Sequence, residues 1–371
     1  MRLCFNFIFV AGCKSQDHHT EKKYSFHKLT AVQIYCMRME IPKTKELEER
    51  VFAITNEKEF AVIALEVFHF QYRYNPLYHD YCKALGKSPR EVKTITDIPF
   101  LPISFFKTNR IATTSFNAEL IFKSSGTTGS ANSHHYVKDA NLYVKSFSKG
   151  FKKFYGDVKD YCILGLLPSY LERGNSSLVY MVDYLIRESG HRESGFYLDE
   201  FEKLDAGLKR LGSAGKKTIL IGVTYALLDF GLRFPQQLSN TIIMETGGMK
   251  GRGKEMTRAE LYDYLKKSFG VSHIHSEYGM TELLSQAYGI DGKMASPPWM
   301  KILLRDETDP LLVYGSSETA SGAINIIDLA NLYSCSFIAT EDAGKINTDE
   351  SFEILGRMDN SDIRGCSLMV V

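Results

Sequence analysis

The chain has 371 residues, which at about 100 to 200 residues per domain predicts about two domains and excludes one small module. Hydrophobic residues make up 44% and charged residues 24%, a globular composition far from that of intrinsic disorder. The 45 Lys and Arg nearly balance the 44 Asp and Glu, and a net charge of +1 provides no global field for nucleic acid. We therefore expect no nucleic-acid partner.

The cysteines and apolar runs indicate the compartment. Seven cysteines are scattered along the chain without a Cys-x-x-Cys or Cys/His metal-ligand spacing, which predicts reduced thiols. The longest apolar run, at residues 5–11, is shorter than the about 20 residues that a membrane helix needs. We expect a cytoplasmic protein without integral membrane contact.

Residues 1–38 are interpreted as a non-native or disordered N-terminal extension. Val10-Ala11-Gly12-Cys13 resembles a lipoprotein cleavage box, but only 12 residues precede Cys13, whereas signal peptides usually have about 15 to 30. A charged helical pattern opens at Met39, as at a natural start. Lipidation at Cys13 stays the minor alternative.

The following elements alternate in type. Apolar residues recur at helical spacing from Thr44 to Tyr74, and Asn56 followed by Glu59 predicts the start of the second of two helices before Pro76. Alternating strands and helices predict an α/β fold with mostly parallel sheets flanked by helices, whose ligands bind beyond the carboxyl ends of the strands. The apolar runs predicted as strands are 120–123, 161–167, 218–223, 241–245, 271–274 and 311–314.

A loop rich in glycine and hydroxyl side chains leaves the first of these strands. It reads Ser124-Ser125-Gly126-Thr127-Thr128-Gly129-Ser130. Glycine lets backbone N–H groups approach a polyphosphate closely, and hydroxyls donate to its oxygens. The closing Gly-Lys-Ser/Thr of a Walker loop is missing. Alone, such a loop is more often a solvated connection, so its interpretation depends on a second motif.

The second motif is His275-Ser276-Glu277-Tyr278-Gly279-Met280-Thr281-Glu282, which follows the apolar run at 271–274. Its aromatic ring, hydroxyl and carboxylate could stack a base, bind a phosphate and hold Mg²⁺. The alternative is a strand-to-helix turn in which Glu282 only favours a helix N-terminus.

Together, Ser-Ser-Gly-Thr-Thr-Gly and Tyr-Gly-Met-Thr-Glu, about 150 residues apart, resemble the adenylate-forming superfamily of acyl-CoA synthetases. Thr-Glu-Asp-Ala-Gly at 340–344 is similar to its ribose-binding motif, and Leu-Gly-Arg-Met-Asp at 355–359 to its hinge. Within the superfamily, residues 98–107 and 245–254 resemble the acyl-protein synthetases, or long-chain-fatty-acid luciferin-component ligases. The resemblance implies a large domain at 39–355 with a helical N-terminal segment at 39–97. A hinge and short arm at 356–371 would follow, with the C-terminal small domain absent or vestigial.

The resemblance also implies ATP and Mg²⁺ as cofactors. The phosphates would lie against the hydroxyl-rich loop, the adenine against a glycine floor and an aromatic ring, and the ribose hydroxyls against an aspartate. The implied cofactor-binding residues are Ser124, Ser125, Gly126, Thr127, Thr128, Gly129, Gly247, Gly248, Tyr278 and Asp342. The implied catalytic residues are Thr281 at the α-phosphate, Glu282 as the Mg²⁺ ligand, Arg357 near the ribose or phosphate, and Cys366.

The expected reaction is attack of a carboxylic acid, a fatty acid by resemblance, on the α-phosphate of ATP. It gives acyl-AMP and pyrophosphate, followed by acyl transfer to an acceptor protein, a carrier protein or CoA. Cys366, the sixth residue from the end and close to Arg364, could carry the acyl group as a thioester; the alternative is an incidental thiol. Two other hypotheses stay open: an acyl-CoA ligase of the phenylacetate-CoA ligase type, and a catalytically silent nucleotide-binding protein.

Overall fold

The computed structural model describes residues 43–124, 132–167, 175–198, 200–247, 256–314 and 320–358. Some of the expectations therefore concern residues outside the described ranges, namely 1–38, Ser125, Gly126, Thr127, Thr128, Gly129, Gly248 and Cys366. Within the described ranges, no helix is both long enough and apolar enough to cross a bilayer.

The described elements alternate along most of the chain. The helices are α2 (Lys43–Val51), α3 (Glu57–Tyr74), α4 (Pro76–Ala84), α5 (Phe105–Thr108), α6 (Ala140–Tyr155), α7 (Ser177–Ser189), α8 (Phe201–Ser213), α9 (Thr224–Arg233) and α10 (Arg258–Phe269), with short 3-10 turns at Val158–Asp160 and Leu329–Asn331. The strands are β1 (Leu101–Pro102), β2 (Leu120–Lys123), β3 (His134–Val137), β4 (Cys162–Leu166), β5 (Gly195–Phe196), β6 (Thr218–Val223), β7 (Thr241–Thr246), β8 (Ile274–Tyr278), β9 (Ala287–Ile290), β10 (Lys293–Ala295), β11 (Met300–Arg305), β12 (Val313–Tyr314), β13 (Ala320–Asp328), β14 (Phe337–Ile346) and β15 (Phe352–Arg357).

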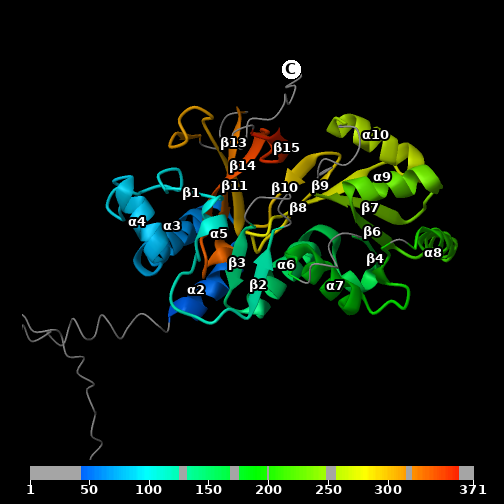
Figure 1. The fold of residues 1–371 in the computed structure, drawn as a ribbon, viewed down its shortest axis with the longest axis horizontal. Helices are drawn as coiled ribbons and strands as arrows, with labels where there is room; N and C mark the ends of the chain where they lie inside the picture. Colours follow the sequence, from blue (N-terminus) through cyan, green and yellow to red (C-terminus); the bar gives the residue numbers. More distant parts are fainter. Residues whose placement is uncertain are drawn as a thin grey trace, which may run out of the picture. The chain divides into compact units, whose positions relative to one another are not determined.

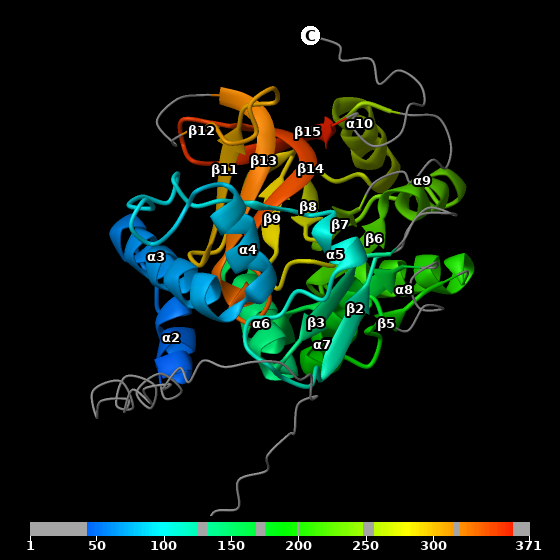
Figure 2. The ribbon, with the colours of Figure 1, turned by 60° about the vertical axis from the view of Figure 1, so that its left-hand side comes forward.

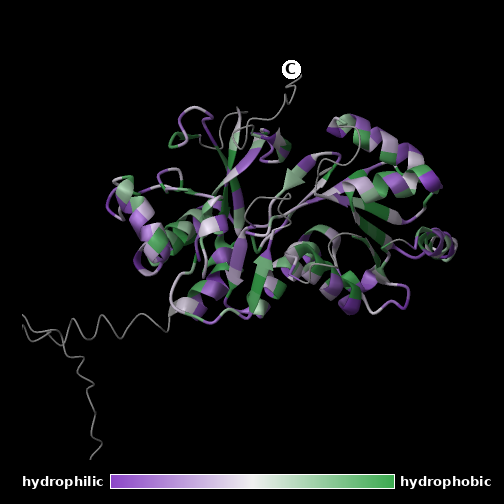
Figure 3. Cartoon of the chain, in the orientation of Figure 1, coloured by the Kyte–Doolittle hydropathy of each residue, from purple (hydrophilic) through white to green (hydrophobic). Residues whose placement is uncertain are grey.

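The α/β class is confirmed, and parallel pairing holds for one half of the large sheet. There the strand order is β8-β7-β6-β4-β5, and all neighbours run parallel. Helices α6 and α7 cover one face, and α9 and α10 cover the other (Figure 1). These helices carry both hydrophilic and hydrophobic residues, as amphipathic covers of a sheet must (Figure 3). The predicted strands at 218–223 and 241–245 are β6 and β7.

The expectation of mostly parallel sheets is wrong for the other half. From β8 the order continues β9-β10-β15-β14-β13-β11-β12, and every neighbouring pair is antiparallel. No α-helix lies between these strands along the described chain, so hairpins replace the crossovers that parallel pairing requires. The predicted strand at 120–123 also pairs antiparallel, with β3 in a separate hairpin.

Two strand boundaries were predicted too early. Gly270 ends α10 in the left-handed conformation, and the strand expected at 271–274 begins only at Ile274. The first residues of the second motif are therefore part of β8. The strand expected at 311–314 is reduced to β12, because Leu311 and Leu312 are exposed.

The two helices predicted before Pro76 are confirmed, with α4 beginning at that proline. The Asn56 side chain caps α3 by accepting a hydrogen bond from the backbone N–H of Glu59 at 3.0 Å. At the other end of α3, the buried Gln71 side chain bonds the backbone of residues 331, 332 and 336. Helices α3 and α4 thereby pack beside the antiparallel half of the sheet (Figure 2).

Candidate active site

The expected glycine floor and aromatic ring meet at the carboxyl ends of β7 and β8. These strands pair in parallel with Thr246 opposite Glu277, so Gly247 and Tyr278 follow side by side. Gly247 has a φ of +70°, which favours glycine. The Thr224 hydroxyl, at the start of α9, donates to the Gly247 carbonyl at 2.9 Å. Both residues therefore lie at the carboxyl ends of parallel strands, where ligands of such sheets bind.

The expected ribose residue lies against the expected adenine residue. The Tyr278 hydroxyl donates to Oδ2 of Asp342 at 2.8 Å, although 64 residues separate them in sequence. Arg357 pairs with Asp342 across β15 and β14, and its Nε lies 3.8 Å from Oδ1. Burial raises the pKa of Asp342, while the tyrosine hydroxyl and the guanidinium oppose that shift. Burial and this carboxylate raise the pKa of Tyr278 well above 10, so the phenol stays a donor.

The hairpin β2–β3 connects the described end of the hydroxyl-rich loop to the second motif. Ser124, the loop residue that the structure describes, accepts at Oγ from the N–H of Ser133 at 2.9 Å. The Ser133 hydroxyl hydrogen-bonds the Glu282 carboxylate. His135 in β3 contacts the Thr281 carbonyl oxygen through Nδ1 at 2.8 Å. The flanks of the loop thus lie against Thr281 and Glu282.

Glu282 is a buried carboxylate near two cations. Burial raises its pKa, and the Ser133 hydroxyl, Arg357 and Lys107 oppose that shift. Mg²⁺ in nucleotide sites is typically held by one or two carboxylates together with phosphate oxygens and water. No group of at least three His, Cys, Asp or Glu side chains suited to a metal occurs among the described residues. Glu282 thus offers a buried carboxylate, a type of oxygen donor that Mg²⁺ accepts beside phosphate oxygens.

A second buried carboxylate, Glu277, precedes Tyr278 on the opposite face of β8 and was given no role in the sequence analysis. It accepts a hydrogen bond from the Thr246 hydroxyl of the neighbouring strand. Burial raises its pKa to about 7, with a further increase from Glu245. A Cβ on Gly279 would lie 2.6 Å from Oε1 of Glu277, so this carboxyl group fills the space beneath the motif.

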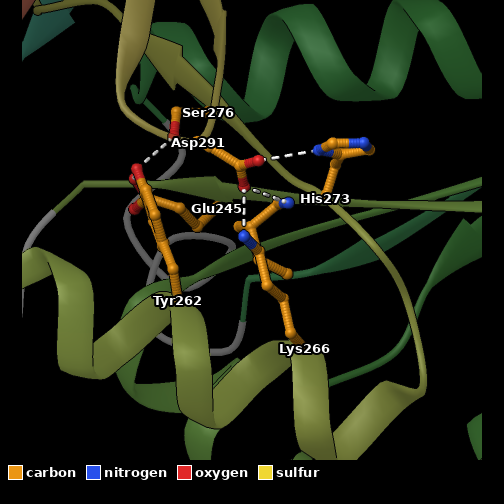
Figure 4. Close-up of polar contacts among 7 residues, drawn as sticks. Glu245, Tyr262, Lys266, His273, Ser276 and Asp291 are labelled. Carbon is orange, nitrogen blue, oxygen red and sulfur yellow. Dashed lines mark hydrogen bonds and ion pairs between the residues drawn. The ribbon is translucent and has the colours of Figure 1, made fainter.

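Two polar clusters, one about Glu245 and one about Asp291, join α10 to β7 and β8 (Figure 4). The Tyr262 hydroxyl of α10 lies 3.3 Å from Oε1 of Glu245 and 2.7 Å from Oγ of Ser276. At the amino end of β8, Asp291 lies 3.0 Å from Nζ of Lys266, and it also accepts from the Ile274 N–H. These contacts fix α10 and β8 to each other.

Sequence reasoning also missed His135, which is completely buried between the hairpin and residues 331–336. Its Nε2 lies 2.9 Å from the Ser334 hydroxyl, and Phe106 packs edge-on against the ring. Burial lowers the pKa of His135 to about 4, so the ring is neutral near pH 7. A lone histidine in a short strand carries no pattern that could have indicated this bridge.

The described cysteines are free and buried, in agreement with reduced thiols. Burial raises the pKa of Cys82 to about 12 and also raises those of Cys162 and Cys335. A thiol that resists ionisation inside the core is a poor nucleophile. These side chains are therefore unsuited to accept an acyl group.

Comparison with known proteins gives a family match and curated relatives. The family described as "Acyl-protein synthetase, LuxE" matches residues 47–371. The chain is 23% identical over 367 residues to the long-chain-fatty-acid–luciferin-component ligase of Aliivibrio fischeri, with 89% of this chain and 95% of that protein covered. A protein of the same description from Photorhabdus luminescens is 32% identical over 104 residues, covering 26% of this chain and 89% of that protein.

Similar solved structures include a luciferase-like enzyme from the mealworm Zophobas morio, at 16% identity and a TM-score of 0.45. Another is a long-chain-fatty-acid-CoA ligase from Archaeoglobus fulgidus, at 16% identity and a TM-score of 0.46. The matches cover 69% and 64% of this chain and 61% and 51% of those two structures.

Proposed function

The chain belongs to the acyl-protein synthetase (LuxE) family, and on that premise we propose a reaction for it in two steps. A fatty acid carboxylate attacks the α-phosphate of ATP, forming acyl-AMP and releasing pyrophosphate. A thiolate on a protein then attacks the acyl carbonyl carbon, forming a thioester and releasing AMP. Each step breaks one bond to a phosphate leaving group, so neither needs an oxidant or a reductant.

The observation that carries the proposal is the convergence of Tyr278, Asp342 and Arg357 beside Thr281 and Glu282. An adenine stacked on the Tyr278 ring would bring the ribose hydroxyls to Asp342. Thr281, three residues along the same loop, would then reach the α-phosphate. Arg357 is exposed beside the Asp342 carboxylate, near the expected ribose, and its positive charge would neutralise a nearby phosphate.

Electrostatics explains why cations are needed here. Two anions, the fatty acid carboxylate and the triphosphate, must come within bonding distance during the first step. Mg²⁺ held by Glu282 and the phosphates would supply positive charge to the triphosphate. Lys107 already acts electrostatically on Glu282 from α5 and would add to the positive potential of the site.

The acceptor thiol of the proposal is Cys366, as the resemblance implies. The described cysteines are buried and resist ionisation, which disfavours them as acceptors. Cys366 lies two residues after Arg364, a cation that favours the thiolate. We propose that Cys366 receives the acyl group before it passes to a partner protein.

Pyrophosphate exchange with the purified chain tests the first step. We expect exchange that requires Mg²⁺ and a long-chain acid, measured across a panel of acids of increasing length. Exchange without any added acid would contradict the specificity for a carboxylate. Acceleration of AMP release by free CoA would instead favour the phenylacetate-CoA ligase type, and ATP binding without any exchange would favour a catalytically silent nucleotide-binding protein.

Mass spectrometry tests the second step. After incubation with ATP, Mg²⁺ and a long-chain acid, we expect a hydroxylamine-labile mass gain on the C-terminal tryptic peptide. The Cys366→Ser variant should lose this label but keep pyrophosphate exchange. Cys82→Ser is the matched control, since its buried thiol should not affect labelling. Label that persists in Cys366→Ser would show that another thiol is the acceptor.

A further inference from the structure

The strand that carries Asp342 bulges at that residue. In the pairing of β14 with β13, residues 340–342 stand opposite Ile324 alone, because the flanking ladder pairs are 339 with 325 and 343 with 323. Extra residues on one strand bend it and leave backbone groups outside the ladder. At this bulge Asp342 accepts the hydrogen bond from the Tyr278 hydroxyl. The candidate ribose site is thus built on an irregularity of the sheet.

The guanidinium of Arg305, at the end of β11, fills this bulge. Its Nη1 donates to the carbonyl oxygen of Ile324 and to Oδ1 of Asn325, each at 2.7 Å. Its Nη2 donates to the carbonyl oxygen of Thr340 at 2.6 Å. The two terminal nitrogens of the Arg305 guanidinium therefore join β13 to β14 where the regular pairing of these strands is interrupted.

The contact continues to Asp342 through one side chain. Oγ1 of Thr340 donates to the Ile324 carbonyl oxygen at 2.8 Å and accepts from the backbone N–H of Asp342 at 3.2 Å. Arg305 holds the carbonyls on both sides of this bridge. A change in the guanidinium would therefore move the Asp342 backbone.

This arrangement is costly for stability. Arg305 is 8% exposed, and the oxygens that it contacts are all neutral. Burying a cation without an anionic partner is unfavourable. In addition, Nδ2 of Asn325 is buried and has no hydrogen-bond partner among the described residues. An apolar side chain would avoid the buried charge, so packing alone does not account for Arg305.

We propose that Arg305 is a positioning residue of the nucleotide site. Its guanidinium fixes the bulge in the geometry that presents Asp342 both to the Tyr278 hydroxyl and to the ribose hydroxyls of ATP. The inference rests on the proposed function for the identity of the nucleotide. Arg305 acts through Thr340 and the Asp342 backbone, not by touching the reacting atoms.

The test compares binding of ATP with binding of 2′,3′-dideoxy-ATP by calorimetry, using the full chain. Wild-type protein should prefer ATP by at least about tenfold, since hydrogen bonds to a carboxylate are strong. Arg305→Met, which keeps the length but loses the donors, should reduce this preference to below about threefold. Its affinity for dideoxy-ATP should stay within about twofold of wild type. Arg305→Lys should be intermediate, because one ammonium group cannot replace both terminal nitrogens.

Gln71→Ala is the control for general destabilisation, because Gln71 is buried in α3 and has no part in the nucleotide site. It should lower the melting temperature and keep the preference for ATP. If Arg305→Met does not fold, Arg305→Lys carries the test. Equal losses of ATP and dideoxy-ATP affinity, or an unchanged preference in folded Arg305 variants, would overturn the inference.

Two further outcomes separate this inference from the proposed function. A wild-type chain that prefers ATP to dideoxy-ATP in binding, but shows no acid-dependent exchange, would refute the proposed reaction and leave the role of Arg305 intact. A chain that exchanges pyrophosphate without any preference for the ribose hydroxyls would refute the ribose contact of Asp342 and with it the role of Arg305, and would leave the proposed reaction intact.

Discussion

At the scale of single residues, Tyr278 combines an aromatic face with a hydroxyl that is already engaged by Asp342. Replacing Tyr278 by Ala should weaken ATP binding by about 1 to 3 kcal/mol, the usual contribution of base–aromatic stacking. Tyr278→Phe keeps the ring and should cost less, about 1 kcal/mol, through the lost hydrogen bond. Calorimetric titration with ATP measures both. If melting temperature falls sharply in Tyr278→Ala while ATP affinity is unchanged, the ring belongs to the core instead.

Replacing Glu282 by Gln removes the negative charge of the side chain and keeps its shape. Glu282→Gln should reduce Mg²⁺-dependent pyrophosphate exchange by at least about 100-fold, because a metal ligand loses its charge. The fold should persist, since the carboxylate is buried at a cost that the neutral amide avoids. Exchange assays paired with thermal melts check both expectations. Wild-type exchange in this variant would exclude Glu282 from the metal site.

Glu277 should make stability depend on pH. Its folded-state pKa of about 7 lies above the ordinary value of 4.5, so its stabilising contribution is fully present below pH 4.5 and is lost as pH rises through 7. Glu277→Gln mimics the protonated form. Relative to wild type, this variant should gain up to about 3 kcal/mol between pH 5 and pH 8. Urea unfolding at both pH values measures the gain, and a difference that does not change with pH would contradict the assignment.

At the scale of elements, sequence periodicity located the segments whose side chains face one core. Strands β6 and β7 were predicted because continuous apolar runs mark strands buried on both faces. Strands β13 and β14 were not predicted. Their irregular pairing is satisfied by Arg305, whose partners lie 19 to 35 residues further along the chain, and no local pattern encodes such contacts.

The candidate site divides in the same way. Tyr278, Glu282 and Asp342 were predictable because short motifs contain them. His135 and Arg305 were not, since each acts by filling a space that exists only after distant strands have met.

The second irregularity of β14, between Ala343 and Gly344, predicts the effect of a single methyl group. A Cβ on Gly344 would lie 2.6 Å from Cδ1 of Ile324 and 2.9 Å from the Glu353 carbonyl oxygen. Gly344→Ala should therefore destabilise the fold by about 1 to 3 kcal/mol. Gly195→Ala is the matched control, because a Cβ in that strand meets nothing within 4 Å. Chemical denaturation measures the free energy of unfolding of both variants. Equal values for Gly344→Ala and Gly195→Ala would contradict the register of β14 with its neighbouring strands.

At the scale of the whole molecule, the described residues from 45 to 358 form one compact unit. Gln71 contributes to that unity, because it ties α3 to residues 331–336 with both ends of its amide. Gln71→Ala should cost about 3 kcal/mol, since several buried backbone groups lose their partners. The single tryptophan, Trp299, packs against Phe52 of the N-terminal segment. Its fluorescence therefore reports whether the N-terminal segment is packed on the rest of the protein.

Fluorescence and circular dichroism should follow one unfolding transition in wild type and in Gln71→Ala, shifted to lower denaturant in the variant. Separate transitions for the two signals would show that the halves of the sheet unfold independently.

The tie between α3 and residues 331–336 also has a consequence during translation. Partners of Gln71 are synthesised 260 to 265 residues after it. At about 5 to 20 residues per second, α3 waits roughly 13 to 53 seconds on the ribosome before they exist. Throughout that wait, the apolar face that includes Phe60, Val67 and Phe68 has no native partner from this segment. The nascent chain therefore offers chaperones a long-lived amphipathic helix, and its yield in cells should depend on them more than its final stability does.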